Sequence, residues 1–188
     1  MEEKEHILEI LKQVKNALRK KDYVKIKNLS NQVVHSSSIE QDPNIIFTAV
    51  IIYSLSKLIE RNYYQKYSNW NEFYKDYINA IDRIIRALEK DNLRLYTQEI
   101  SNVNRLIEKL SGELKNFISD VFRKAKINKA SKIYEHGISM SKTAKILGIS
   151  IWELAEYAGQ KKVPESNISI TMSIKDRIKL LEDFLSKR

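Results

Sequence analysis

Hydrophobic residues recur every three or four positions along most of the chain, which is the spacing of amphipathic helices. The pattern predicts helices over residues 2–21, 22–34 and 43–62, with a loop of small polar residues at 35–42. Asp42 and Pro43 supply a helix cap followed by proline at the first helical position, a strong start signal. The third helix is apolar on nearly every side, so we expect it to be the core of an N-terminal helical bundle.

A second pattern covers residues 92 to about 135, which contain no proline and a single glycine, Gly112. Apolar residues there alternate gaps of four and three, the seven-residue period of a coiled-coil seam. One unbroken helix would reach roughly 60 Å at 1.5 Å per residue. Gly112 and the lysine-rich section near Lys126 are the two candidate break points. A seam of this kind must pack along the N-terminal helices or pair with a second chain. The seam consists of Tyr96, Ile100, Val103, Ile107, Leu110, Leu114, Phe117 and Val121.

Residues 137–159 predict two short helices joined by a tight turn, the organisation of a helix-turn-helix. Ser141 is the expected cap of the first helix, and Gly148 ends it in a left-handed turn. Ser150 and Glu153 have the spacing of a capping box for the second helix. The outward side of that second helix lacks the Arg, Lys, Asn and Gln side chains that read base edges. It is expected to hold Ser150, Ile151, Trp152, Ala155 and Glu156.

Composition indicates a soluble all-α protein. The chain has 188 residues, of which 43% are hydrophobic and 30% charged, with only four glycines and two prolines. The absence of cysteine excludes disulfides, thiolate metal sites and cysteine nucleophiles, and it fits a cytoplasmic location. The most apolar run, residues 45–59, is interrupted by polar side chains and is short for a membrane span, so we expect no membrane partner. No nucleophile, metal cluster or phosphate loop is in place, so we expect neither a cofactor nor an enzyme.

The positive charge is concentrated toward the end of the chain. Residues 125–188 hold 12 basic and 7 acidic side chains, a net charge of +5, whereas residues 1–124 hold 21 and 17, a net charge of +4. A basic surface favours phosphate polyanions. The alternative is that a lysine-rich chain reflects genome composition or a hot habitat. The predicted DNA-binding residues are Lys126, Lys129, Lys132, Ser141, Lys142, Lys145, Ser150, Ile151, Trp152, Lys161 and Lys162.

The chain ends in a segment with a different pattern. Val163 and Pro164 favour an extended backbone. Apolar and polar residues then alternate over 168–174, as in a strand, before a last amphipathic helix. The alternating run either pairs with a copy of itself in a dimer or serves as an extended linker. We therefore expect a helical bundle at 1–120, a basic helix-turn-helix module at 121–162, and an arm with a final helix at 163–188.

Two stretches also resemble known families. The run SMSKTAKILGISIWELAEY, preceded by ASKIYEHGI, resembles the helix-turn-helix of small prokaryotic antitoxins. The run LSNQVVHSSSIEQDPNIIFTAVIIYSLSKLIER resembles part of an uncharacterised archaeal all-helical family, which brings no known activity. Together the resemblances imply a prokaryotic, archaeal, regulator-like protein.

These observations predict a transcriptional regulator that binds double-stranded DNA mainly through the phosphate backbone. We expect a homodimer, because two DNA-binding heads on one palindromic site multiply the weak preference of each head for its specific DNA sequence. The alternative is an antitoxin-type or adaptor module in which Ile151 and Trp152 dock a protein partner. An aromatic cluster at residues 63–77, interspersed with lysines, has the composition of a base-stacking surface. Its helical spacing favours core packing instead.

Overall fold

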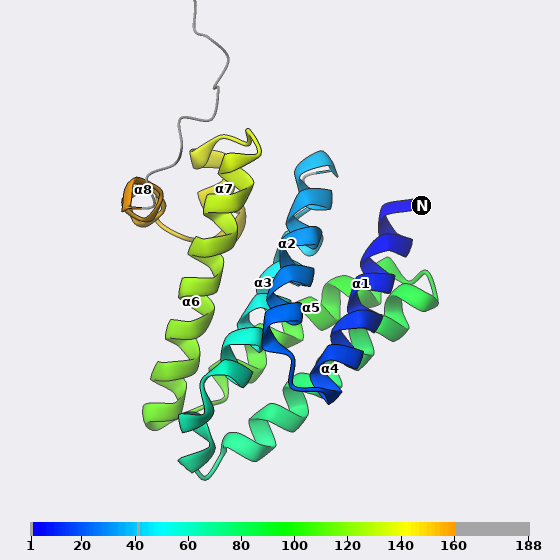
Figure 1. Ribbon diagram of the computed structural model, residues 1–188, viewed down its shortest axis with the longest axis vertical. Coiled ribbons are helices and arrows are strands. Elements are labelled where there is room, and N and C mark those ends of the chain that lie inside the picture. Colours follow the sequence, from blue (N-terminus) through cyan, green and yellow to red (C-terminus); the bar gives the residue numbers. More distant parts are fainter. Residues whose placement is uncertain (1, 41, 161–188) are drawn as a thin grey trace, which may run out of the picture.

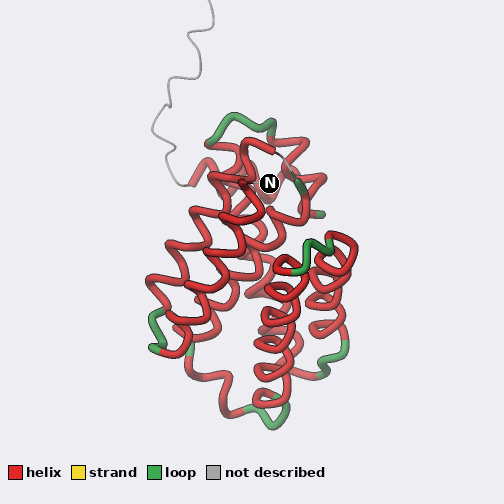
Figure 2. The backbone as a smooth tube through the Cα atoms, turned by 90° about the vertical axis from the view of Figure 1, so that its right-hand side faces the viewer, coloured by secondary structure: helices red, strands yellow, loops and turns green. Residues whose placement is uncertain are grey.

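The computed structural model describes residues 2–40 and 42–160, and over these residues the protein is all-helical. Figures 1 and 2 show the helices packed side by side, with short turns between them. The expected C-terminal arm and last helix lie outside the described residues, as do Lys161 and Lys162. The elements are α1 (Glu2–Arg19), α2 (Tyr23–Glu40), α3 (Pro43–Glu60), the 3-10 helix η1 (Asn62–Lys66), α4 (Trp70–Glu89), α5 (Leu93–Glu108), α6 (Gly112–Glu135), α7 (Met140–Leu147) and α8 (Ile151–Gln160).

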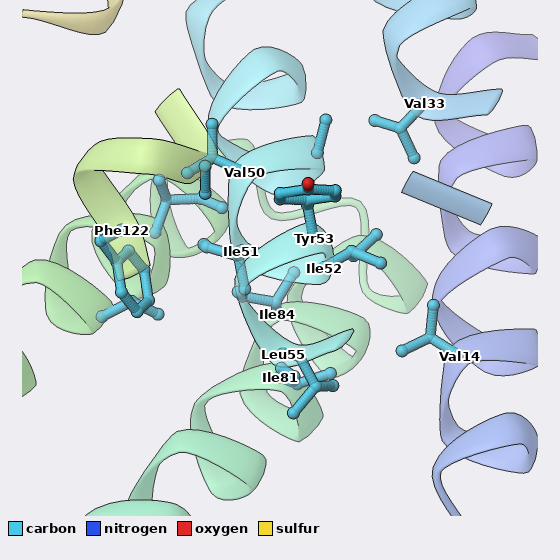
Figure 3. Close-up of a cluster of buried hydrophobic side chains, with 14 of the residues drawn as sticks. Val14, Val33, Val50, Ile51, Ile52, Tyr53, Leu55, Ile81, Ile84 and Phe122 are labelled. Carbon is cyan, nitrogen blue, oxygen red and sulfur yellow. The ribbon is translucent and has the colours of Figure 1, made fainter. Parts of the chain in front are cut away.

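Helix α3 is the centre of the core. Asp42 caps it through its carboxylate, which accepts a hydrogen bond from Asn44 N at 2.8 Å, and Pro43 opens the first turn. Helices α2, α5, α6 and α7 all contact it. Figure 3 shows that α3 is packed on both sides, with Ile52 on the side of Val14 and Val33 and Ile51 on the side of Phe122. By length and composition α3 could cross a membrane, but 67% of it is buried inside the protein, as in a core helix.

The aromatic cluster packs into the same core. Tyr64 and Tyr77 are fully buried, and Trp70 and Phe73 nearly so. The Tyr77 hydroxyl donates a hydrogen bond to Ile51 O at 2.7 Å, and burial raises the pKa of this tyrosine. Rings buried in this way are not available to stack nucleobases. Core packing therefore accounts for these four rings, as their spacing indicates, while Tyr67 and Tyr74 are partly buried against the same core.

Two element boundaries differ from the sequence-based prediction. The loop predicted at 35–42 is wrong, because α2 continues to Glu40. Serine is tolerated inside helices, and neither glycine nor proline occurs before Pro43 to end this one. The seam over residues 92–135 is divided between α5 and α6, with the break at Gly112, whose φ is +60°. No second break occurs near Lys126, which lies within α6.

The bundle contains a structural repeat that sequence analysis did not identify. The buried positions of α1 recur 70 residues later in α4, and most of those of α2 recur in α5. The turns that follow α1 and α4 are also alike. Lys21 and Asp91 adopt left-handed backbones with φ of +52° and +53°. The paired core residues are Ile7 and Tyr77, Ile10 and Ala80, Leu11 and Ile81, Val14 and Ile84, Ala17 and Ala87, Ile26 and Tyr96, and Val33 and Val103.

The two turns share their hydrogen bonds as well. Asp22 N donates to Ala17 O at 3.0 Å, and Asn92 N donates to Ala87 O at 2.9 Å. These are the bonds of a Schellman motif, in which a left-handed residue ends the helix. The Asp22 and Asn92 side chains then cap the next helix, each accepting a backbone N–H three residues on at 2.9 Å.

Packing between the halves follows the same repeat. Helix α1 packs against its equivalent α4, and α3 packs against its equivalent α6. Helix α2 contacts α6, and its equivalent α5 contacts α3. Such reciprocal contacts are what an approximate two-fold relation between α1–α3 and α4–α6 produces. Helices α7 and α8 have no counterpart in the first half, and they follow directly from the end of α6.

Candidate nucleic-acid interface

The predicted C-terminal motif corresponds to α7 and α8, which are joined by a turn at Gly148–Ser150. Ser139 caps α7, since its Oγ accepts a hydrogen bond from Lys142 N at 3.3 Å. The prediction that Ser141 is the cap is therefore wrong, and Ser141 is an exposed residue in the first turn of α7. Both serines precede the apolar stripe, and spacing alone does not separate an Ncap from a position two residues later.

The turn has the predicted conformation. Gly148 is left-handed with φ +61° and ψ +42°, and Ile149 N donates to Ala144 O at 3.1 Å. Ile149 is partly buried against the main core, and the buried residues Ala144, Leu147 and Leu154 belong to that core. The α7–α8 pair is consequently held by the same apolar cluster as the bundle.

The start of α8 is fixed by a capping box and an ion pair. Ser150 N donates to Glu153 Oε2 at 3.0 Å, and Trp152 N donates to Ser150 Oγ at 3.2 Å, as the sequence predicts. Arg123 Nε on α6 donates to Glu153 Oε1 at 2.6 Å. The hydrogen bond from Ser150 N lowers the pKa of the Glu153 carboxyl, and the Arg123 side chain lowers it further. These contacts orient α8 on α6.

Within residues 2–40 and 42–160, only one side of α8 is covered. Leu154 and Ala158 are buried against the protein, and the Tyr157 hydroxyl accepts a hydrogen bond from Asn128 Nδ2 at 2.8 Å. On the other side, Trp152 is 81% exposed and Ile151 41% exposed. The remaining residues predicted to face outward, Ser150, Ala155 and Glu156, are exposed too.

The structure separates the predicted phosphate-binding lysines into three groups. Lys142 and Lys145 on α7 are exposed, whereas Lys132 and Lys126 on α6 are partly buried. Burial lowers the pKa of Lys126, whose Nζ lies 5.8 Å from the centre of the Phe47 ring. Lys129 is fully buried, so its ammonium group does not reach a surface where a phosphate binds.

Lys129 instead joins three helices inside the protein. Its Nζ donates to Ser30 Oγ at 2.7 Å and to Asn31 Oδ1 at 2.8 Å, both on α2. It also lies 4.3 Å from the centre of the Tyr53 ring on α3, a cation–π distance. The sequence holds a signal for this position, because Phe122, Ala125, Lys129 and Ile133 share the inward stripe of α6.

Among residues 2–40 and 42–160, no group of three or more His, Asp or Glu side chains is placed to hold a metal ion. His35 on α2 and His136 at the end of α6 lie side by side, with ring centroids 5.3 Å apart. The candidate functional site is the α7–α8 pair, because it combines an exposed helix face with nearby exposed lysines.

Comparison with known proteins found no match to a family model, to a curated protein or to a solved structure. The resemblance to antitoxins and to an archaeal helical family thus stays a prediction.

We expect Gly148→Ala to destabilise the protein by roughly 1–2 kcal/mol, because a side chain disfavours the left-handed backbone. The methyl group itself meets nothing within 4 Å, so the effect is conformational. Gly159→Ala is the matched control, since Gly159 is helical and equally open, and it should be neutral or slightly stabilising. Urea denaturation of both variants measures the difference. Equal effects at the two positions would contradict the role assigned to Gly148.

Lys129→Ala should destabilise the protein by on the order of 3 kcal/mol, because it opens a cavity and leaves Asn31 Oδ1 without this donor. Lys145→Ala, at an exposed position on α7, should change the free energy of unfolding by less than about 0.5 kcal/mol. Denaturant titration monitored by circular dichroism gives both values. A Lys129→Ala variant as stable as Lys145→Ala would show that the buried contacts contribute nothing.

Proposed function

We propose that the protein is a DNA-binding transcriptional regulator in which α7 and α8 act as a helix-turn-helix. The observation that carries the proposal is the packing of α8, because its inner side is held on α6 while Ile151 and Trp152 are exposed at its N-terminal end. In DNA-binding units of this type, the first residues of the second helix enter the major groove. A free side at this end of α8 is the minimum that such docking requires.

Phosphate contacts supply most of the affinity in this proposal. Lys142 and Lys145 lie on α7, the helix that crosses the DNA backbone in such a unit, and both are exposed. Partly buried Lys132 is the next nearest candidate in sequence. Lys129 is not included because it is buried.

In this proposal the protein recognises individual bases only weakly. Ser150, Ile151 and Trp152 would approach thymine methyl groups and respond to groove shape, because none of them makes the bidentate contacts that identify a base. Glu156, on the same side of α8, is exposed, and its negative charge is repelled by phosphates. A homodimer with two such heads would raise the discrimination, and size-exclusion chromatography with light scattering tests for it.

The affinity for duplex DNA should fall steeply with salt, and Lys142→Gln/Lys145→Gln should reduce the slope of log K against log [NaCl] by about 2, since each phosphate contact contributes about 0.9. Fluorescence anisotropy with a labelled duplex measures the slope. Lys90→Gln/Arg94→Gln, two exposed positions on the α4–α5 turn, removes the same charge elsewhere and should leave the slope unchanged. A slope that survives the α7 changes rules out the proposed DNA interface.

The alternative function is a protein-interaction module of antitoxin or adaptor type. The specific observation in its favour is the 81% exposure of Trp152 beside exposed Ile151, because large aromatic side chains are frequent anchors of protein interfaces. The lack of a base-reading side chain at the start of α8 fits this alternative as well. Both functions use the same face of α8, so the Trp152 side chain distinguishes them.

Trp152→Ala should leave the free energy of unfolding within about 0.5 kcal/mol of the parent, because the side chain is exposed. If α8 docks into DNA, the variant should bind the duplex several-fold more weakly, and addition of DNA to the parent should change the exposed-indole emission. Trp70 is buried and gives an independent signal. An unchanged duplex affinity in Trp152→Ala would contradict the docking of Trp152 into the major groove.

A further inference from the structure

A second cationic surface lies at the turn between α1 and α2, far in sequence from α7. Its five basic side chains fall within nine residues and are all exposed. None of them takes part in an ion pair among the described residues. The one acidic residue in this stretch is Asp22, whose carboxylate caps α2. We call this cluster the basic turn, consisting of Arg19, Lys20, Lys21, Lys25 and Lys27. Because Lys25 and Lys27 are two positions apart on α2 and point about 200° apart, the cations surround the turn instead of forming one flat face.

The repeat within the bundle provides a comparison for the basic turn. The equivalent turn between α4 and α5 has the same backbone conformation and the same capping bonds, as described above. Its nine residues, 89–97, hold two basic and two acidic side chains, whereas residues 19–27 hold five and one. Both acidic residues of the equivalent turn are paired, Glu89 with Lys12 at 3.0 Å and Asp91 with Lys4. The turn therefore folds without a cluster of cations.

The cations of the basic turn repel one another, and no acidic side chain of residues 2–40 and 42–160 forms an ion pair with them. A general richness in lysine does not account for the difference, because it would act on both turns. An external polyanion would supply the missing negative charge. Its binding would release counterions and gain affinity from several phosphates at once.

The apolar neighbours of the basic turn favour a nucleic acid over a membrane. Tyr23 and Val24 are exposed, but they are consecutive on α2 and so point about 100° apart instead of forming one face that could enter a bilayer. A single exposed tyrosine among lysines fits the backbone and bases of a nucleic acid.

We propose that the basic turn is a second phosphate-binding surface, which contacts the backbone of the nucleic acid bound by this protein. This inference rests in part on the proposed function. The basic turn lies at the start of α2, while His35, twelve residues along α2, meets His136 just before α7. His35 therefore lies roughly 18 Å along α2 from the basic turn. One duplex could contact both surfaces, or two separate segments of nucleic acid could contact one each. Figure 1 shows the α1–α2 turn and the α7–α8 pair at opposite ends of α2.

The test uses the full chain and three double variants of equal charge change. Lys20→Gln/Lys25→Gln alters the basic turn, Lys90→Gln/Arg94→Gln alters the equivalent turn, and Lys142→Gln/Lys145→Gln alters α7. Anisotropy with a labelled mixed-sequence duplex gives the slope of log K against log [NaCl] for each. The basic-turn variant should lose about 2 from the slope, and the equivalent-turn variant should lose nothing measurable.

The outcomes separate this inference from the proposed function. A loss in the α7 variant alone would support the regulator proposal and overturn the second surface. A loss in the basic-turn variant alone would support the second surface and overturn the interface on α7. Equal losses in the basic-turn and equivalent-turn variants would show an effect of net charge only and overturn the inference.

Binding to vesicles of phosphatidylcholine and phosphatidylserine is a further experiment on the same variants. Vesicle binding that the basic-turn variant loses, with its duplex slope unchanged, would assign the basic turn to membranes instead.

Discussion

The structure depends on the burial of α3. A helix that is apolar on nearly all sides leaves no face for water, so other helices must surround it. Helices α2, α5, α6 and α7 do so. This requirement places α6 along α3, and the position of α6 in turn determines where α7 and α8 lie. The exposed face of α8 and the basic turn both lie on elements whose positions follow from this packing.

Polar contacts then determine which side of α8 is exposed. Arg123 and Asn128 on α6 bind Glu153 and Tyr157 on α8, and these bonds hold the side of α8 that carries Leu154 against the core. Lys129, on the same helix, is bound inside the bundle by Ser30 and Asn31. Helix α6 thus uses its polar residues for internal contacts, although its sequence is basic enough to suggest a DNA-contacting surface. The exposed basic residues near the site are correspondingly fewer than the sequence indicates.

Because of the repeat, the α1–α2 turn can be compared with an equivalent turn in the same protein. Two turns with the same left-handed residue and the same capping bonds differ in their charges, so the charges are not needed for the turn to form. Sequence analysis did not identify this repeat, because the two halves share the spacing of apolar positions more than the identities of residues. Ile7 and Tyr77 occupy equivalent places, as do Ile26 and Tyr96, and only the packed structure shows that they correspond.

Much of the fold could be predicted from local signals. The start of α3 at Asp42 and Pro43, the left-handed Gly148 and the capping box of Ser150 and Glu153 all depend on residues within a few positions of one another. The same holds for the exposed Ile151 and Trp152, whose place on α8 follows from helical periodicity. The end of α2 could not be predicted, because serines permit both loop and helix and no residue there decides between them.

The sequence by itself determined the helical class, the core role of α3, and the two short helices with their turn, since these follow from apolar spacing and local capping. Only the tertiary structure decided that the Lys129 ammonium binds Ser30 and Asn31, that Ser139 rather than Ser141 caps α7, and that α1–α3 pack against α4–α6 as a repeat. The physical reason is that lysine spacing indicates where charge lies along a helix. Whether a given ammonium faces water or a neighbouring helix depends on how helices distant in sequence pack together.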